Sequence, residues 1–312
     1  MTVRILFAAL EKRWAEFEVP LRAALSEAGM AYELAPDLGP PETIDYIVYA
    51  PNSDVQDFSP FTRTKAVLGL WAGVEDVVYN TTLTQPFARM VDDGLTRGMV
   101  EWVTGHVLRH HLGMDPQIKK AGNWEALHYV PPLAQDRHVT ILGLGALGRA
   151  CAETLSRLGF SITGWSRSPK DIPGVACLHG NEGLQEALSV GDIVVLLVPN
   201  TPETQNLLNA ETLGHLPTGS VIVNPGRGPL IDDDALIAAL ETGQVGHATL
   251  DVFRIEPLPE QHPYWTHPGV TITPHIASET RASSAARVIA QNVQRGETGQ
   301  PFLYLLDREL GY

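Results

Sequence analysis

The sequence predicts an α/β fold of two domains with a cleft between them. Its 312 residues are long for one hydrophobic core and short for three. Short apolar segments alternate with helical patterns, which is typical of parallel sheets covered by helices on both faces. The alternation runs in two series, separated by a long helical stretch that starts near residue 99.

The first domain is expected to comprise residues 1–98 and 285–312, because the chain becomes helical again after residue 280 and can return to it. Its expected helix covers residues 16–28. Its expected strands cover residues 3–9, 45–50 and 65–70.

The second domain is expected to comprise residues 99–284. It begins with the helical stretch 99–122, whose apolar stripe over residues 99–113 is either a dimer face or a surface buried within the monomer. We expect a homodimer. Six strands are expected in this domain, over residues 139–143, 161–165, 192–198, 220–224, 247–251 and 270–273.

The composition excludes several classes of partner. Acidic residues outnumber basic ones by 36 to 22, and a net charge of -14 repels nucleic acid and anionic lipid surfaces. No segment approaches the roughly 20 apolar residues of a membrane span. An anionic small molecule must then be attracted by local positive charge, which makes a buried arginine a candidate ligand.

The two cysteines, Cys151 and Cys177, fit neither a disulfide framework nor the spacing of metal ligands. We expect both cysteines to be packing residues in a reducing compartment, and we expect no metal site. The amino-terminal apolar run lacks a small-residue cleavage site and meets charge again at Glu11, so it predicts a first strand. A cytoplasmic location is expected.

A glycine motif follows the first strand of the second series. In GLGALGR, Gly143, Gly145 and Gly148 form G-x-G-x-x-G between a strand and an amphipathic helix, and Ala146 and Leu147 lie between the last two glycines. The glycines allow a tight turn, the approach of a pyrophosphate and close helix packing, while the helix offers free N–H groups. The motif predicts a Rossmann-type domain with a bound dinucleotide; the alternative is a turn that happens to be rich in glycine.

The next strand ends without the acidic residue that usually binds the adenosine ribose of NAD. Ser166, Arg167 and Ser168 stand there instead, with Lys170 nearby. An arginine and two hydroxyl groups suit a 2′-phosphate, so NADP is the preferred cofactor. The alternative is a solvated Arg167 in a site that also accepts NAD.

Three further residues are candidates for the reactive centre. Arg227 closes a strand between two glycines, at the sheet edge where ligands gather, and its planar fork suits a carboxylate. The alternative is a surface ion pair with the acidic run 232–234. His275 also closes a strand, and an imidazole can exchange a proton with a ketone near neutral pH. A carboxylate partner, Glu256, would orient the ring and raise its pKa.

These motifs resemble the D-isomer-specific 2-hydroxyacid dehydrogenase family over nearly the whole chain, and most of all its glyoxylate/hydroxypyruvate reductase branch. The resemblance rests on GLGALGR, DIVVLLVPNTPETQNLLN, NPGRGPLID, LDVFRIEPLPEQHPYWTHP and TPHIAS. It implies that Arg227 binds the substrate carboxylate, that His275 is the general acid/base and that Glu256 is its partner. It also implies cofactor contacts at Asp251, Val198, Pro199 and Pro225.

Residues 70–74, LWAGV, resemble the loop of this family whose amides hold the substrate carboxylate, which implies substrate contacts at Trp71, Ala72 and Gly73. Trp71 replaces the small residue that is common there. Its ring either closes the pocket on small acids or packs outward.

Together with these patterns, the resemblance implies a smaller flavodoxin-like substrate domain and an NADPH-preferring reductase of small 2-keto acids such as glyoxylate and hydroxypyruvate. Two alternatives stay open: a binding protein that senses the nicotinamide cofactor, as corepressors of the same family do, and a dehydrogenase for longer D-2-hydroxy acids.

Overall fold

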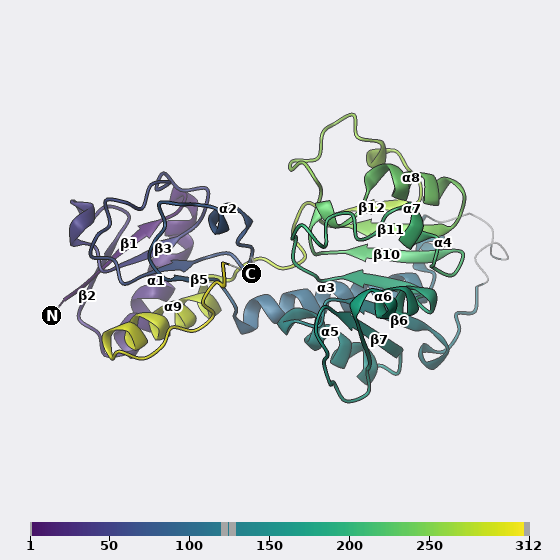
Figure 1. The fold of residues 1–312 in the computed structure, drawn as a ribbon, viewed down its shortest axis with the longest axis horizontal. Helices are drawn as coiled ribbons and strands as arrows, with labels where there is room; N and C mark the ends of the chain where they lie inside the picture. Colours follow the sequence, from purple (N-terminus) through teal and green to yellow (C-terminus); the bar gives the residue numbers. More distant parts are fainter. Residues whose placement is uncertain (1, 120–123, 125–128, 309–312) are drawn as a thin grey trace. The chain divides into compact units, whose positions relative to one another are not determined.

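The computed structural model describes residues 2–119, 124 and 129–308 of the chain (Figure 1). The chain forms two compact units, each with one sheet. The first unit comprises Met1–Leu95 and Glu279–Tyr312, and the second comprises Thr96–Ser278. The α/β class and the two-domain architecture are confirmed. The chain passes between the units three residues before the expected crossing at 98/99 and six before that at 284/285.

The first unit contains a five-stranded sheet in which all neighbours are parallel, in the order β2-β1-β3-β4-β5. This order is that of flavodoxin-like domains. The strands are β1 (Val3–Ala8), β2 (Tyr32–Ala35), β3 (Tyr46–Tyr49), β4 (Ala66–Gly69) and β5 (Phe87–Ala88). The edge strands β2 and β5 were not expected, because β2 buries only Leu34 and β5 has two residues.

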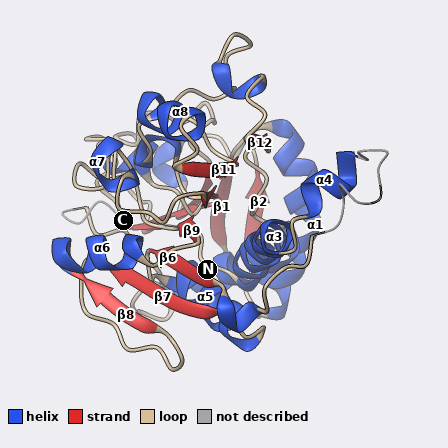
Figure 2. Cartoon of the chain, turned by 90° about the vertical axis from the view of Figure 1, so that its right-hand side faces the viewer, coloured by secondary structure: helices blue, strands red, loops and turns tan. Residues whose placement is uncertain are grey.

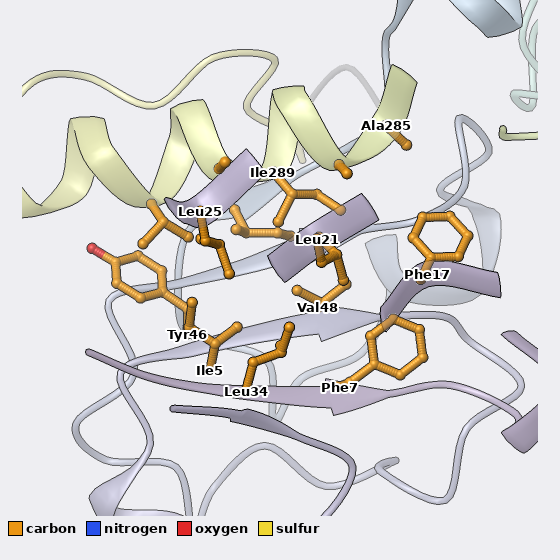
Figure 3. Close-up of a cluster of buried hydrophobic side chains, with 14 of the residues drawn as sticks. Ile5, Phe7, Phe17, Leu21, Leu25, Leu34, Tyr46, Val48, Ala285 and Ile289 are labelled. Atoms are coloured by element: carbon orange, nitrogen blue, oxygen red, sulfur yellow. The ribbon is translucent and has the colours of Figure 1, made fainter. Parts of the chain in front are cut away.

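Two helices cover one face of this sheet. Helix α1 (Glu11–Glu27) and helix α9 (Ala282–Glu297) share a hydrophobic core with the strands. Figure 3 shows Leu21 of α1 and Ile289 of α9 over Val48 of β3. The carboxyl-terminal helix therefore packs in the first unit. Helix α1 begins five residues before the expected start, because its charged first turn hides the helical periodicity. The short helices η1 (Pro41–Thr43) and α2 (Glu75–Val78) complete the unit.

The second unit contains a seven-stranded parallel sheet in the order β12-β11-β10-β9-β6-β7-β8. Its strands are β6 (His138–Leu142), β7 (Ser161–Ser166), β8 (Ala176–His179), β9 (Ile193–Leu196), β10 (Ser220–Asn224), β11 (Val245–Leu250) and β12 (Val270–Ile272). The expected number of six is wrong, because β8 is an edge strand with no fully buried residue and so lacks an apolar run. The order reverses between β6 and β9, and ligands of Rossmann-type sheets bind at that reversal.

Helices cover both faces of this sheet (Figure 2). Helices α3 (Asp93–His111) and α5 (Ala146–Arg157) pack on one face, and α6 (Gly180–Ser189), α7 (Ala210–Leu213) and α8 (Asp233–Glu241) pack on the other. The remaining short helices are α4 (Met114–Lys119), η3 (Ala134–Asp136), η4 (Gly228–Leu230) and η5 (Pro263–Trp265).

The long helical stretch is interrupted after His111 and resumes as α4; residues 120–122 of the expected stretch lie outside the described residues. Its apolar stripe, Met99, Val103 and Val107, is buried in the core of the second unit. Of the two interpretations of this stripe, the structure supports burial within the monomer. No helix in the described part of the chain has the length and apolar character of a membrane span.

Candidate active site

The residues singled out in the second unit follow the carboxyl ends of its strands. Because the strands are parallel, those ends meet at one edge of the sheet. In chain order they are Gly143–Gly148 after β6, Ser166–Ser168 at β7, Val198 and Pro199 after β9, Pro225 and Arg227 after β10, Asp251 and Glu256 after β11, and His275 after β12. The Arg, Glu and His residues therefore share this edge with the glycine motif.

The glycine motif has two tightly packed positions and one open position. A Cβ on Gly148 would lie 1.7 Å from the Gly143 carbonyl oxygen, and one on Gly143, whose φ is +108°, would lie 2.5 Å from the Leu197 carbonyl. A Cβ on Gly145 would meet no atom within 4 Å. Gly145 is also the N-cap of α5, and no side chain caps the helix. The N–H groups in the first turn of α5 are therefore free of a capping side chain, and the open space beside them at Gly145 fits a pyrophosphate.

The end of β7 presents one buried and two exposed side chains. The Ser166 hydroxyl donates to the Ser168 carbonyl oxygen at 2.8 Å, so its proton is already used within the protein. Arg167 and Ser168 are exposed. Hydrogen bonds to Thr201 and to its own backbone, helped by the nearby charge of Arg167, hold the pKa of Glu203 below its ordinary value. The charge of Arg167 therefore acts on the loop that follows β9.

Arg227 is held by a residue that the sequence reasoning missed. The buried Asn224 amide donates to the Arg227 carbonyl oxygen at 3.0 Å, and its own oxygen accepts the Gly226 N–H at 3.0 Å. A Cβ on Gly228 would lie 2.0 Å from the Phe253 carbonyl carbon, so only glycine fits after the arginine. The sequence feature that could have indicated this role of Asn224 is its place in the NPGRG run.

Two residues of the acidic run 232–234, Asp232 and Asp233, hold elements of the second unit in place. Asp232 caps α8 by accepting the Ala235 N–H at 3.1 Å. Asp233 accepts the Tyr264 hydroxyl at 2.9 Å and lies 3.5 Å from Arg254 Nε. Burial raises the pKa of Asp233 and outweighs these contacts. Asp233 thus anchors the segment that carries Glu256, a role that the sequence did not reveal.

Asp251 fixes the turn that carries the histidine. Its buried carboxylate accepts the Thr273 hydroxyl at 2.6 Å and the N–H groups of Ile276 and Ala277, each at 2.9 Å. Its carbonyl oxygen accepts the His275 N–H at 2.8 Å. His275 has a φ of +54°, a conformation that a side chain with a Cβ adopts only when its surroundings hold it there. The cofactor contact expected of Asp251 stays a prediction, and the structure adds this anchoring role.

His275 and Glu256 form a close pair. The His275 Nδ1 atom lies 2.6 Å from Glu256 Oε2, and the other carboxylate oxygen accepts the Phe253 N–H at 2.9 Å. The hydrogen bond that His275 donates to Glu256 raises the pKa of His275, although burial and the charge of Arg227 oppose it. Burial by itself raises the pKa of Glu256, but the bonds from His275 and Phe253 outweigh it and lower the pKa. The pair leaves Nε2 for proton exchange with a ligand.

Replacing Glu256 with glutamine should lower the pKa of His275, because the amide has no negative charge to stabilise the imidazolium. Ketone reduction needs protonated His275, so kcat/KM should fall as pH rises through that pKa. In Glu256→Gln this fall should occur at lower pH than in the wild type. The check is the pH dependence of kcat/KM for reduction, and an unmoved alkaline limb would contradict the role of Glu256.

The expected substrate loop lies in the first unit, directly after β4. Trp71, Ala72 and Gly73 are all partly buried. The Trp71 ring packs against the hydrophobic core of this unit, together with α1, α9 and the sheet. Its ring is therefore anchored on the protein rather than fully turned to solvent.

The comparisons with known proteins agree with this geometry. Residues 103–277 match the family model described as D-isomer specific 2-hydroxyacid dehydrogenase, NAD binding domain. Glyoxylate/hydroxypyruvate reductase A of Serratia proteamaculans is 40% identical over 260 residues, which cover 80% of this chain and 82% of that protein. The protein of the same name from Yersinia enterocolitica is 36% identical over 285 residues, 88% of this chain and 90% of that protein.

Solved structures match over the whole chain as well. A D-isomer specific 2-hydroxyacid dehydrogenase from Xanthobacter autotrophicus Py2, in complex with NADPH and MES, has a TM-score of 0.92, 38% identity and full coverage of both chains. The NADPH-dependent glyoxylate/hydroxypyruvate reductase of Sinorhizobium meliloti, in complex with NADP and sulfate, has a TM-score of 0.85 and 30% identity, with 100% and 99% coverage. The chain therefore belongs to the D-isomer-specific 2-hydroxyacid dehydrogenase family, which confirms the resemblance of its motifs.

Proposed function

We propose that the protein is an NADPH-preferring reductase of small 2-keto acids such as glyoxylate and hydroxypyruvate. The observation that carries this proposal is the hydrogen-bonded His275–Glu256 pair at the sheet edge that also holds Arg227 and the glycine motif. Curated relatives at 36–40% identity are named glyoxylate/hydroxypyruvate reductase A, which supports the same substrate class.

In the proposed reaction, Arg227 binds the substrate carboxylate and polarises the keto oxygen. When bound, NADPH supplies the hydride for the carbonyl carbon. His275 donates the proton on Nε2 to the oxygen, and Glu256 stabilises the imidazolium before this transfer. We also propose substrate contacts at the amides of the loop Trp71–Gly73. Asp251 and Asn224 keep the His275 turn and the Arg227 backbone in place.

The chain offers fitting groups for the cofactor. The uncapped amino terminus of α5 and the open space at Gly145 suit the pyrophosphate, and Ala146 and Leu147 form the first turn of that helix. Arg167 and Ser168 suit the 2′-phosphate. We propose the remaining contacts at Ser166, Val198, Pro199, Pro225 and Asp251. NAD is the second cofactor, used with lower efficiency.

The direct test is a steady-state assay with NADPH or NADH and glyoxylate, hydroxypyruvate or phenylpyruvate. We expect the highest kcat/KM for NADPH with a small acid. NADPH binding without turnover on any acid would favour a cofactor-sensing protein, and a preference for phenylpyruvate would favour a dehydrogenase of longer acids. A higher efficiency with NADH would reject the cofactor assignment. A homodimer and a cytoplasmic location stay predictions.

Replacing Arg167 with alanine should raise KM for NADPH by about 10- to 100-fold, the loss expected when a phosphate loses charge-assisted hydrogen bonds. KM for NADH should change little, because NADH has no 2′-phosphate. Arg157→Ala is the matched control: its side chain is 78% exposed at the end of α5, and its loss removes the same charge from the same unit. Equal effects on the two cofactors would contradict a phosphate contact at Arg167.

A further inference from the structure

We propose that Thr280 is a positioning residue for the substrate loop Trp71–Gly73. Its hydroxyl fixes the backbone of that loop so that two amides stand ready for the substrate carboxylate. This inference rests on the proposed function, because the loop acts on a substrate only if the protein binds 2-keto acids. Thr280 lies in the first unit, two residues after the chain enters it from the second.

The contact between Thr280 and the loop is short and buried. Thr280 is 9% exposed, and its Oγ1 donates to the Leu70 carbonyl oxygen at 2.6 Å. The guanidinium of Arg13 donates to the Thr280 carbonyl oxygen at 3.1 Å and so holds the threonine from its backbone side. Leu70 is fully buried, and its N–H donates to the Tyr49 carbonyl oxygen at 2.8 Å. The residue before the loop is therefore fixed through both of its backbone groups.

Peptide planarity passes this constraint to the loop. The Leu70 carbonyl and the Trp71 N–H belong to one rigid trans peptide, so they point in opposite directions. A bond that fixes the carbonyl consequently fixes the direction of the Trp71 N–H. The next peptide is fixed in the same way, because the Trp71 carbonyl oxygen accepts the Met90 N–H at 3.0 Å and the Ala72 N–H shares that plane.

The two amides fixed in this way are available to a ligand. Within residues 2–119, 124 and 129–308, neither the Trp71 N–H nor the Ala72 N–H donates to a protein acceptor. Under the proposed function, the anion that these two neighbouring amides bind is the carboxylate of a small 2-keto acid. Because the protein orients the donors before the ligand arrives, binding requires less ordering of the loop.

The experiment compares Thr280→Val, which keeps the shape and removes the hydroxyl, with Thr280→Ser, which keeps the hydroxyl. We expect Thr280→Val to raise KM for glyoxylate about tenfold, the usual loss when a hydrogen bond to a charged group, here from a loop amide to the substrate carboxylate, is not made. KM for NADPH should be unchanged. Thr280→Ser should restore KM to within about twofold of the wild type.

Thr64→Val is the matched control. Thr64 is 8% exposed, also lies in the first unit, and donates its hydroxyl to the Ile44 carbonyl oxygen at 3.0 Å, away from the substrate loop. It should lower the melting temperature as Thr280→Val does, without changing KM for glyoxylate. Similar KM changes in the two valine variants would show a general loss of stability and overturn the inference.

A second measurement separates this inference from the proposed function. If the wild type lacks reductase activity, the proposed function fails. The affinity for oxalate, a small dicarboxylate probe, is then measured by calorimetry with NADPH present. Oxalate binding that weakens in Thr280→Val but not in Thr64→Val supports the positioning role. Equal affinity in the wild type and Thr280→Val, or no oxalate binding, overturns it, as does unchanged KM in an active Thr280→Val enzyme.

Discussion

Replacing His275 with alanine should lower kcat for glyoxylate reduction by about 10²-fold or more, because the keto oxygen then lacks its proton donor. NADPH should still bind with nearly wild-type affinity, since the glycine motif and Arg167 are unchanged. The measurements are kcat with saturating cofactor and the dissociation constant of NADPH from fluorescence titration. The residual activity should also lose the alkaline limb that His275 gives to the pH profile.

His215→Ala provides the control for His275→Ala. His215 lies before β10, at the opposite end of the strands, and contacts Gln185. Its removal should leave kcat and the pH profile as they are in the wild type. Turnover of His275→Ala near the wild-type value would show that another group donates the proton and would remove His275 from the mechanism.

Replacing Arg227 with methionine should lower kcat/KM for glyoxylate by about 10²- to 10⁴-fold, the effect of losing two hydrogen bonds to a carboxylate at about 1.5–3 kcal/mol each. Arg227→Lys should recover only part of this loss, because an ammonium group cannot present two parallel donors. Steady-state kinetics on both variants test this expectation.

NADPH affinity should change little in both variants, because Arg227 follows β10 and the glycine motif follows β6. Arg157→Met is the matched control for the loss of a positive charge in the second unit. If Arg227→Lys were as active as the wild type, a simple charge would be enough, and bidentate binding of the carboxylate would be contradicted.

Local patterns predicted the elements that have strong signals. The glycine motif could be located because a buried strand and an amphipathic helix flank it directly. The edge strands β2, β5 and β8 could not, because an edge strand buries few side chains and leaves no apolar run. Periodicity detects burial, so elements with little burial are missed.

Site residues followed the same division. Arg227, Glu256 and His275 stand in distinctive sequence motifs, and their proposed chemistry can be inferred from the residue type. Asn224, by contrast, acts through the backbone of its neighbours, which a residue type alone does not disclose. Thr280 contacts a residue 210 positions away in the chain, a contact that only the folded unit creates.

The parallel arrangement of the second sheet gathers the proposed site residues of this unit at one edge of the sheet and leaves the opposite edge without them. Every group with a proposed role follows the carboxyl end of a strand, whereas turns such as Thr242–Gln244 join helix to strand at the other edge. Gly243 adopts a φ of +75° there, with no atom within 4 Å of an added Cβ. A linker attached at this turn would therefore join the second unit to a solid support at the edge of its sheet that carries none of the proposed groups.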